Sequence, residues 1–273
     1  MTIVVENEAG LPGFACEHGL SVWIDVGESQ VLFDTGQGDA FGGNARQLDL
    51  PLASTTAIVL SHGHYDHTGG LAEAIRAAGS PTVYAHPAAF EPKYGRNPDG
   101  TSRDLGISEA NARVARTEAQ VEWVTGPKEI APDLFLTGPV PRETDYENTG
   151  GPFYLDTECT RPDEMIDDQA AFLRTSAGTV VVLGCAHAGV VNTLRYIRAL
   201  TDSDAIHTVV GGMHLVRASE QRMDQTVAEL QRLDVQRIMP CHCTGPAAVS
   251  RLRAELPNRF EPCHAGTVIE IPT

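Results

Sequence analysis

Ser61-His62-Gly63-His64-Tyr65-Asp66-His67-Thr68-Gly69-Gly70 is the stretch that decides the fold and the chemistry of this 273-residue chain. It holds three imidazoles and one carboxylate within six positions, and it follows an apolar run at 57–60. A helical pattern begins directly after it, at 71–75. Imidazole nitrogens suit Zn, Cu, Fe and Ni, whereas carboxylate oxygens suit harder ions. So many potential ligands at the end of a strand predict a transition-metal site rather than a set of unrelated loop residues.

The spacing within this stretch suits two metal ions. His62 and His64 are separated by one residue, so on an extended segment their side chains point the same way. Asp66 and His67 lie just beyond and can reach a second ion. Two ions about 3.5–4 Å apart are typical of two-metal hydrolases. Such a pair needs more ligands than this stretch supplies, so others are expected elsewhere in the chain.

Three later turns repeat the same arrangement, in which a strand leads into a histidine and a helix follows. The strands are predicted at 179–183, 208–210 and 236–239, and the first is a continuous apolar run typical of a strand buried on both faces. Ligands of α/β sheets gather at the carboxyl ends of strands, so these turns are expected to converge with the first one on a single site. The histidines are His187, His214 and His242.

His187 and His242 are predicted metal ligands, because each follows a strongly apolar strand. Cys185 and Asp168 are alternatives for a residue that bridges the ions or completes a ligand shell, and a bridge made by water alone is a third alternative. The alternative reading of Cys185 is a small buried apolar residue.

His214 is predicted to contact the substrate or to transfer a proton, because the preceding Gly211-Gly212 allows a close approach of the backbone, and metal ligation by His214 is the alternative. Asp34 ends an early strand and is expected to orient a ligating histidine, since such histidines usually donate their other N–H to a carboxylate or carbonyl. His86 is expected to have a supporting or structural role. The remaining histidines considered, which have no supporting context, are His18, His207 and His264.

The rest of the chain alternates strands with helices. Further strands are predicted at 3–5, 20–26, 30–34, 82–85, 121–124, 134–136, 169–173 and 268–271, with helices at 44–50, 71–78, 108–116, 191–200, 219–233 and up to 256. Two irregular segments, at 87–120 and 139–167, interrupt this pattern and are expected to cover a substrate or to decorate the surface. The length of the chain and its ordinary apolar content predict one domain over residues 1–273.

The composition argues against several partners. The net charge is −16 and only two lysines are present, Lys93 and Lys128, so a basic surface for nucleic acid or an anionic membrane is not expected. No apolar run has the length of a membrane-spanning helix, and the N-terminus lacks the pattern of a signal peptide. The six cysteines show no disulfide framework. We therefore expect a cytoplasmic protein that acts on a small molecule and binds neither nucleic acid nor membrane; a homo-oligomer is left open.

The stretch from Ser61 to Gly70 resembles the HxHxDH signature of the metallo-β-lactamase superfamily, and Phe33-Asp34-Thr35-Gly36 resembles its first motif. Later pieces resemble a subgroup of metal-dependent hydrolases that are similar to 7,8-dihydropterin-6-yl-methyl-4-(β-D-ribofuranosyl)aminobenzene 5′-phosphate synthase. These pieces lie at 184–193, 211–215 and 240–245.

The resemblance implies an α/β fold, an αβ/βα sandwich of two mixed β-sheets flanked by helices, with a dinuclear site between the sheets. It places His62, His64 and a third group on one ion, and Asp66, His67 and His242 on the other. Many members carry a Gly-His-Thr turn where this chain reads Asp167-Asp168-Gln169. His187 is therefore expected to replace the missing histidine. The cofactor implied is a pair of divalent ions, with zinc favoured and iron or manganese as alternatives.

The predicted function is that of a dinuclear hydrolase in which a metal-bound hydroxide attacks a small phosphorylated or ester-type metabolite. Asp66 is expected to orient the hydroxide, and His214 to stabilise the oxyanion or protonate the leaving group. One alternative is a pterin-related synthase that uses the metals as Lewis acids. Others are an iron-dependent redox enzyme and a metal-binding module without activity.

Overall fold

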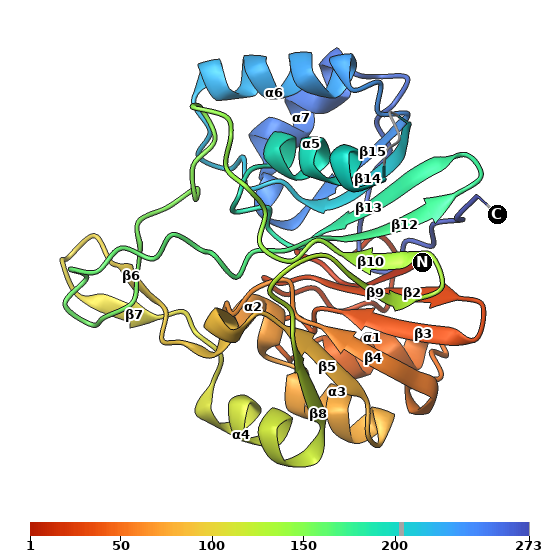
Figure 1. The fold of residues 1–273 in the computed structure, drawn as a ribbon, viewed down its shortest axis with the longest axis vertical. Helices are drawn as coiled ribbons and strands as arrows, with labels where there is room; N and C mark the ends of the chain where they lie inside the picture. The colour runs from red at the N-terminus through yellow and green to blue at the C-terminus, as the bar shows by residue number, and fades with distance from the viewer. Residues whose placement is uncertain (202–204, 273) are drawn as a thin grey trace. The chain divides into compact units, whose positions relative to one another are not determined.

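Two six-stranded mixed sheets carry the fold, one in each of two units of the chain (Figure 1). The computed structural model describes residues 1–201 and 205–272. Unit 1 comprises Met1–Thr125, Pro152–Asp167 and His264–Ile269. Unit 2 comprises Gly126–Gly151, Asp168–Cys263 and the residues from Glu270 onward.

The sheet of unit 1 has the strand order β1-β2-β3-β4-β5-β8. An antiparallel hairpin joins β2 to β3, with Val22 opposite Phe33, whereas β3, β4, β5 and β8 run parallel. The carboxyl ends of β3 and β4 therefore lie at one edge of the sheet, where β3 leads into Asp34 and β4 into Ser61. The strands are β1 (Thr2–Val5), β2 (Ser21–Val26), β3 (Ser29–Phe33), β4 (Thr55–Val59), β5 (Thr82–Ala85) and β8 (Gln120–Trp123).

Helices cover this sheet through apolar residues spaced three and four positions apart. In α3, Leu71, Ala74 and Ile75 are buried and join a cluster with Ile58 and Val83 of the sheet. In α4, Ser108 caps the N-terminus by accepting a hydrogen bond from the N–H of Asn111. The helices are α1 (Phe41–Gln47), α2 (Tyr65–Thr68), α3 (Leu71–Ala78) and α4 (Glu109–Glu118), with short 3-10 turns η1 (Leu52–Ser54) and η2 (Pro87–Phe90).

A small third sheet in unit 1 uses residues from both segments that the sequence left irregular. Its strand order is β11-β6-β7, and Phe153 pairs with Gly95 in antiparallel register. The two segments are therefore hydrogen-bonded to each other inside unit 1. The strands are β6 (Tyr94–Arg96), β7 (Ser102–Asp104) and β11 (Phe153–Tyr154).

The sheet of unit 2 has the order β15-β14-β13-β12-β10-β9, and its strands β13, β14 and β15 run parallel. Apolar residues of α5, α6 and α7 pack with Val181, Val209 and Ile238 in one buried cluster. The elements are β9 (Lys128–Ala131), β10 (Leu134–Leu136), β12 (Ala171–Thr175), β13 (Gly178–Leu183), α5 (Val190–Thr201), β14 (Ile206–Gly212), α6 (Glu220–Arg232), β15 (Arg237–Cys241), η3 (His242–Thr244) and α7 (Pro246–Glu255).

Several predictions of local structure need correction. The strand predicted at 268–271 is wrong, because Val268 forms only an isolated bridge with Thr2. The first helix spans Phe41–Gln47 instead of 44–50. The sequence also missed β9 and the small third sheet, whose residues lack a clear apolar period. The two mixed sheets and the helices between their strands are confirmed, whereas the single domain stays a prediction.

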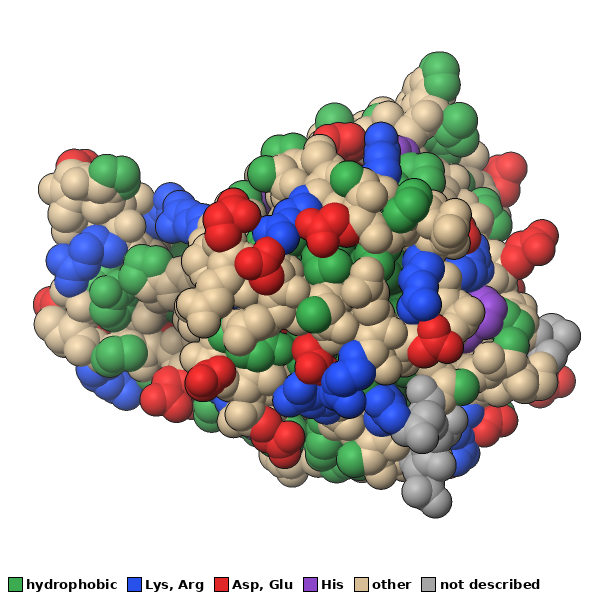
Figure 2. Space-filling view, turned by 90° about the horizontal axis from the view of Figure 1, so that it is seen from above, with side chains coloured by type: hydrophobic (Ala, Val, Ile, Leu, Met, Phe, Trp, Pro, Cys, Tyr) green, Lys and Arg blue, Asp and Glu red, His purple; other side chains and the backbone are tan. Residues whose placement is uncertain are grey.

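The surface carries both signs of charge. Figure 2 shows Asp and Glu side chains scattered among Lys and Arg side chains on one face. Arg251 of α7 pairs with Glu220 and Asp224 of α6 and with Glu255 of its own helix. Among the helices of the described residues, none is long and apolar enough to cross a membrane.

Candidate metal centre

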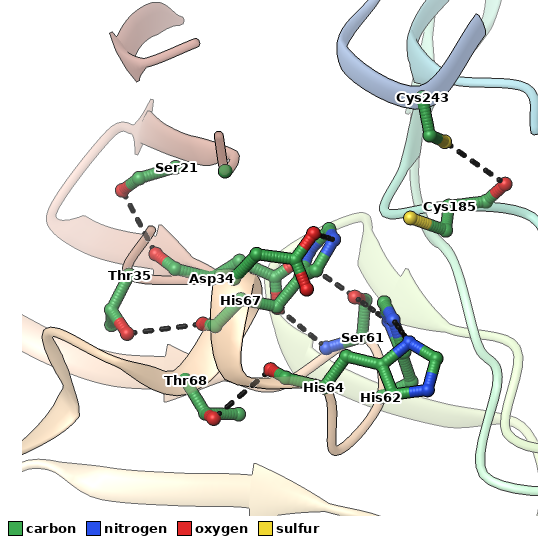
Figure 3. Close-up of polar contacts among 12 residues, drawn as sticks. Ser21, Asp34, Thr35, Ser61, His62, His64, His67, Thr68, Cys185 and Cys243 are labelled. Atoms are coloured by element: carbon green, nitrogen blue, oxygen red, sulfur yellow. Dashed lines mark hydrogen bonds and ion pairs between the residues drawn. The ribbon is translucent and has the colours of Figure 1, made fainter. Parts of the chain in front are cut away.

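The histidine-rich loop of unit 1 lies between β4 and α2. It is held close to the segment that follows β5, where a Cβ added at Gly63 would overlap the carbonyl oxygen of Ala89. A residue with a side chain would displace this loop, so the close approach requires glycine. Figure 3 shows the side chains of the loop with their polar contacts.

His62 and His64 turn their rings toward each other in this loop. Nε2 of His62 lies 3.0 Å from Nδ1 of His64, and both side chains are buried. Two imidazole nitrogens that bind one zinc ion at about 2.0–2.1 Å lie about 2.9–3.4 Å apart. The spacing of these two nitrogens therefore fits a shared ion, as the resemblance implies.

His67 is oriented by Asp34, which follows β3. The carboxylate Oδ2 of Asp34 lies 2.7 Å from Nδ1 of His67 and also accepts a hydrogen bond of 2.6 Å from the Ser61 hydroxyl. The other oxygen, Oδ1, accepts the Ser61 N–H at 2.7 Å. With Nδ1 of His67 committed to the carboxylate, Nε2 is the ring nitrogen that can bind a metal. Asp34 thus lies where the sequence predicted it, behind a candidate ligand.

Asp66 contacts a histidine that the sequence did not single out. Its Oδ2 lies 3.2 Å from Nε2 of His18 and 3.8 Å from Nε2 of His67. The His18 side chain is 55% exposed, whereas that of Asp66 is 9% exposed. His18 therefore places a solvent-exposed imidazole beside the carboxylate.

A buried lysine supports the loop from the irregular segments. Nζ of Lys93 lies 2.9 Å from Asp163 and 3.0 Å from Oδ1 of Asp167, and Oδ2 of Asp167 accepts the N–H of Gly63 at 2.8 Å. Burial alone lowers the pKa of a lysine, but the two carboxylates outweigh it and raise the pKa of Lys93. Lys93 is therefore charged, and through Asp167 it fixes the backbone of the histidine loop.

The environment of His64 keeps its ring neutral. Burial lowers the pKa of His64 to about 3, against an opposing effect of Asp66. The ring of Phe153 packs on it at a centroid distance of 4.9 Å. Metal ligation requires neutral imidazole, so this ring needs no deprotonation at neutral pH before it can bind an ion.

In unit 2, His187 follows β13 in the turn that leads to α5. Its Nδ1 lies 2.7 Å from the carbonyl oxygen of Thr149, to which it donates, and Arg142 donates to the carbonyl oxygen of His187 at 2.8 Å. Nε2 is consequently the nitrogen that can bind a metal. Glu147 accepts the N–H groups of Val191 and Asn192 at the start of α5. The segment that holds Arg142, Glu147 and Thr149 is thereby fixed over the turn that carries His187.

His214 and His242 both adopt left-handed backbone conformations, with φ of 45° and 50°. Such a conformation is uncommon in residues other than glycine, and it occurs at functional sites. The His214 ring packs against that of His187 at a centroid distance of 4.3 Å.

The predicted residue Asp168 contacts the turn that carries His187. Its carboxylate accepts the N–H of Ala188 at 2.8 Å.

Two cysteines lie close to His214. The ligand atoms of Cys185, His214 and Cys243 all lie within 4.8 Å of one another. Burial by itself raises the pKa of a thiol, but contact with the Cys185 thiol and the nearby His214 and His242 lower the pKa of Cys243 well below its usual value.

The structure thus groups the predicted residues within each unit. In unit 1 it brings together His62, His64, Asp66, His67 and Asp34, and in unit 2 it places His187, His214, Asp168 and Cys185 in neighbouring turns. His86 instead caps η2 by accepting the N–H of Ala88. Sequence reasoning did not assign a role at the site to five residues, which are His18, Lys93, Asp163, Asp167 and Glu147. The scarcity of lysine was the one sequence feature that drew attention to Lys93.

A sequence model of the metallo-β-lactamase superfamily matches residues 15–242. The chain belongs to the metallo-β-lactamase superfamily. The resemblance of the His62–His67 motif is therefore confirmed, and the chain has the fold of this superfamily.

Three relatives of the chain align with almost its whole length. One is a crystal structure described as Tm1679, a metal-dependent hydrolase of the β-lactamase superfamily. Its sequence is 32% identical to this chain, and the alignment covers 100% of this chain and 98% of that chain with a TM-score of 0.86. An uncharacterized protein of Methanocaldococcus jannaschii is 34% identical over 98% of this chain and 99% of its own length. From the same organism, 7,8-dihydropterin-6-methyl-4-(β-D-ribofuranosyl)-aminobenzene-5′-phosphate synthase is 28% identical over 98% of this chain and 95% of its own length.

Proposed function

We propose that the protein is a hydrolase that binds divalent metal ions and acts on a small phosphorylated or ester-type metabolite. The observation that carries the proposal is the pairing of His62 Nε2 with His64 Nδ1 at 3.0 Å, beside a His67 that is oriented by Asp34. Superfamily membership and the relative named as a metal-dependent hydrolase support the same class of reaction.

The proposed ligands follow the motif. His62 and His64 would hold one ion, and a second would bind the carboxylate oxygen of Asp66 and the ring nitrogen of His67. Zinc is the favoured metal for this donor set, with iron and manganese as alternatives. Ligation by His187 and His242 stays a prediction from the sequence and the resemblance.

Bound divalent ions would supply Lewis acidity and lower the pKa of water. The protein's own residues would do the rest. Asp34 keeps the proton of His67 on Nδ1, and the Asp66 carboxylate is available to accept a proton from water and to orient it. His18, 3.2 Å from Asp66 and exposed to solvent, can carry that proton away. His214 is predicted to donate a proton to the leaving group.

Metal analysis combined with a substrate screen tests this function. Purified protein should contain a divalent metal, and metal-replete protein should cleave at least one of a phosphodiester, a phosphomonoester, a lactone or a thioester. Asp66→Asn should lower the rate at least 100-fold, whereas Asp25→Asn, at an exposed position of β2, should not change it. The function is wrong if no substrate is cleaved and Asp66→Asn alters no measurable property.

A second candidate is a pterin-related synthase, because the relative named as such a synthase aligns over 98% of this chain. This reaction forms a bond, with the ions as Lewis acids. Incubation with a dihydropterin pyrophosphate and an aminobenzene ribotide distinguishes the two functions. A condensed product with release of pyrophosphate supports the synthase, and hydrolysis products alone support the hydrolase.

A further inference from the structure

We propose that Cys185, His214 and Cys243 form a zinc-binding site within unit 2. It would bind the ion through two thiolates and one imidazole. The proposal does not depend on the hydrolase function, because none of its three residues is among the ligands proposed in unit 1. It does replace the proton-donor role predicted for His214.

The three residues occupy equivalent places on neighbouring parallel strands. Cys185 comes two residues after the end of β13, His214 two residues after β14, and Cys243 two residues after β15. The register aligns these ends, since Leu183 pairs with Gly211 and Gly212 pairs with Cys241. The sheet itself therefore brings the three side chains to one edge.

Their distances suit a tetrahedral ion. The three ligand atoms all lie within 4.8 Å of one another. At a Zn–S distance of about 2.3 Å, tetrahedral geometry places two thiolate sulfurs about 3.8 Å apart. Binding would thus draw the side chains together by at most about 1 Å, which rotation about side-chain bonds can supply.

Backbone hydrogen bonds fix the turns that carry these ligands. The N–H of Gly212 donates to the carbonyl oxygen of Gly184 at 3.0 Å, and the N–H of Val216 donates to that of Cys243 at 3.3 Å. The Cys243 thiol lies 3.7 Å from the carbonyl oxygen of Cys185 (Figure 3). Sites built on fixed turns hold their ligands in place before the ion arrives.

The loop after β10, which contains Gly150, covers the imidazole. The ring of His214 packs against that of His187 on one side, and a Cβ added at Gly150 would overlap it. Cys185 is 2% exposed and Cys243 is 7% exposed, so the proposed site is shielded from solvent. Shielding strengthens the attraction between a divalent ion and two thiolates.

The donor set selects a softer metal than the unit 1 residues do. Thiolates favour zinc and copper(I), whereas carboxylates favour magnesium, calcium and manganese. The alternative is that both cysteines are small apolar residues of the core. Cys263 fits that alternative, since among the described residues it belongs to no group of potential ligands. On this proposal, His214 acts as a ligand instead of the predicted proton donor.

Cobalt substitution of the full-length protein tests the proposal. Cobalt(II) bound to thiolate gives a near-ultraviolet charge-transfer absorption that imidazole and carboxylate ligands do not give. Wild-type protein should show this absorption, and Cys243→Ser, Cys185→Ser and His214→Ala should each lose it along with about one equivalent of metal. Cys263→Ser is the matched control and should retain the absorption. His62→Ala should also retain it while losing metal from unit 1.

Absence of the absorption in wild-type protein would overturn the proposal without any variant. An absorption that survives Cys243→Ser would also overturn the proposal. This includes the case in which only Cys185→Ser removes the absorption, because Cys185 would then bind a different ion. A protein that keeps the absorption but cleaves no substrate contradicts only the hydrolase function.

Discussion

The carboxylate of Asp34 lies 2.7 Å from Nδ1 of His67, and both side chains are fully buried. The same carboxylate also accepts the hydroxyl and the N–H of Ser61. One acidic side chain directly after β3 thus fixes both the backbone that begins the histidine loop and the ring of His67 in α2. Metal affinity should depend on this contact even though Asp34 is not expected to bind an ion.

Replacing Asp34 by Asn should lower metal affinity by about 10–100-fold, since an amide orients the His67 ring less strongly than a carboxylate does. Competition against a chromophoric chelator measures this change. Asp25→Asn, on the exposed end of β2, is the control and should leave the affinity unchanged. Equal affinities of the Asp34→Asn variant and the wild type would show that His67 is oriented by other groups.

Lys93→Met should destabilise unit 1 by about 3–5 kcal/mol, because it leaves two buried carboxylates without their partner. Urea unfolding at neutral pH measures the change. The other lysine provides a matched control, and Lys128→Met in β9 should change the free energy of unfolding by no more than about 0.5 kcal/mol. Adding Asp163→Asn to Lys93→Met should recover part of the loss; a further loss would contradict the proposed charge balance.

Gly63→Ala should cost about 3 kcal/mol or more, because the new Cβ would overlap the Ala89 carbonyl oxygen and push the loop away. Gly43→Ala in α1 is the opposite case, since a Cβ there would meet no atom within 4 Å. It should stabilise the protein by about 0.5–1 kcal/mol. Thermal unfolding of both variants gives the comparison, and equal effects would show that the loop can move without cost.

The metal-free protein should lose stability as the pH falls from 6.5 toward 3. Burial lowers the pKa of His64 to about 3, so across this window the unfolded chain binds a proton that the folded protein does not. At pH 5 the loss amounts to about 2 kcal/mol, and above pH 6.5 the ring is neutral in both states.

Urea unfolding of chelator-treated protein at pH 7 and pH 5 tests this expectation. His64→Gln cannot titrate and should show a smaller loss between the two pH values than the wild type shows. His264→Gln, at a partly exposed ring, is the control and should behave as the wild type does. The same loss in His64→Gln as in the wild type would assign the effect to other groups.

Much of the fold could be predicted because local patterns determine it. The bounds of α3, Leu71–Ala78, match the prediction, since its apolar residues recur with a helical period and Gly79 ends it. The strands β13, β14 and β15 were visible as apolar runs that end near a histidine. The motif from His62 to His67 gave the position of the unit 1 residues directly.

Contacts between distant residues left no such pattern. Lys93 lies 70 positions from Asp163 and 74 from Asp167, and a polar residue in an irregular segment gives no sign of its partner. His18 could not be connected with Asp66 for the same reason. The strand predicted at 268–271 failed because its pairing is short. Val268 forms an isolated bridge with Thr2, and Ile269 exchanges backbone hydrogen bonds with Met1.

The ion triad of Lys93, Asp163 and Asp167 has a consequence for how this protein can be altered or can have diverged. Lys93 comes from one inserted segment and both acids come from the other, and β6 and β11 pair the same two segments. A chimera that takes only one segment from a relative would leave a buried charge without its partner beneath the histidine loop. The two segments should therefore be exchanged, or inherited, together.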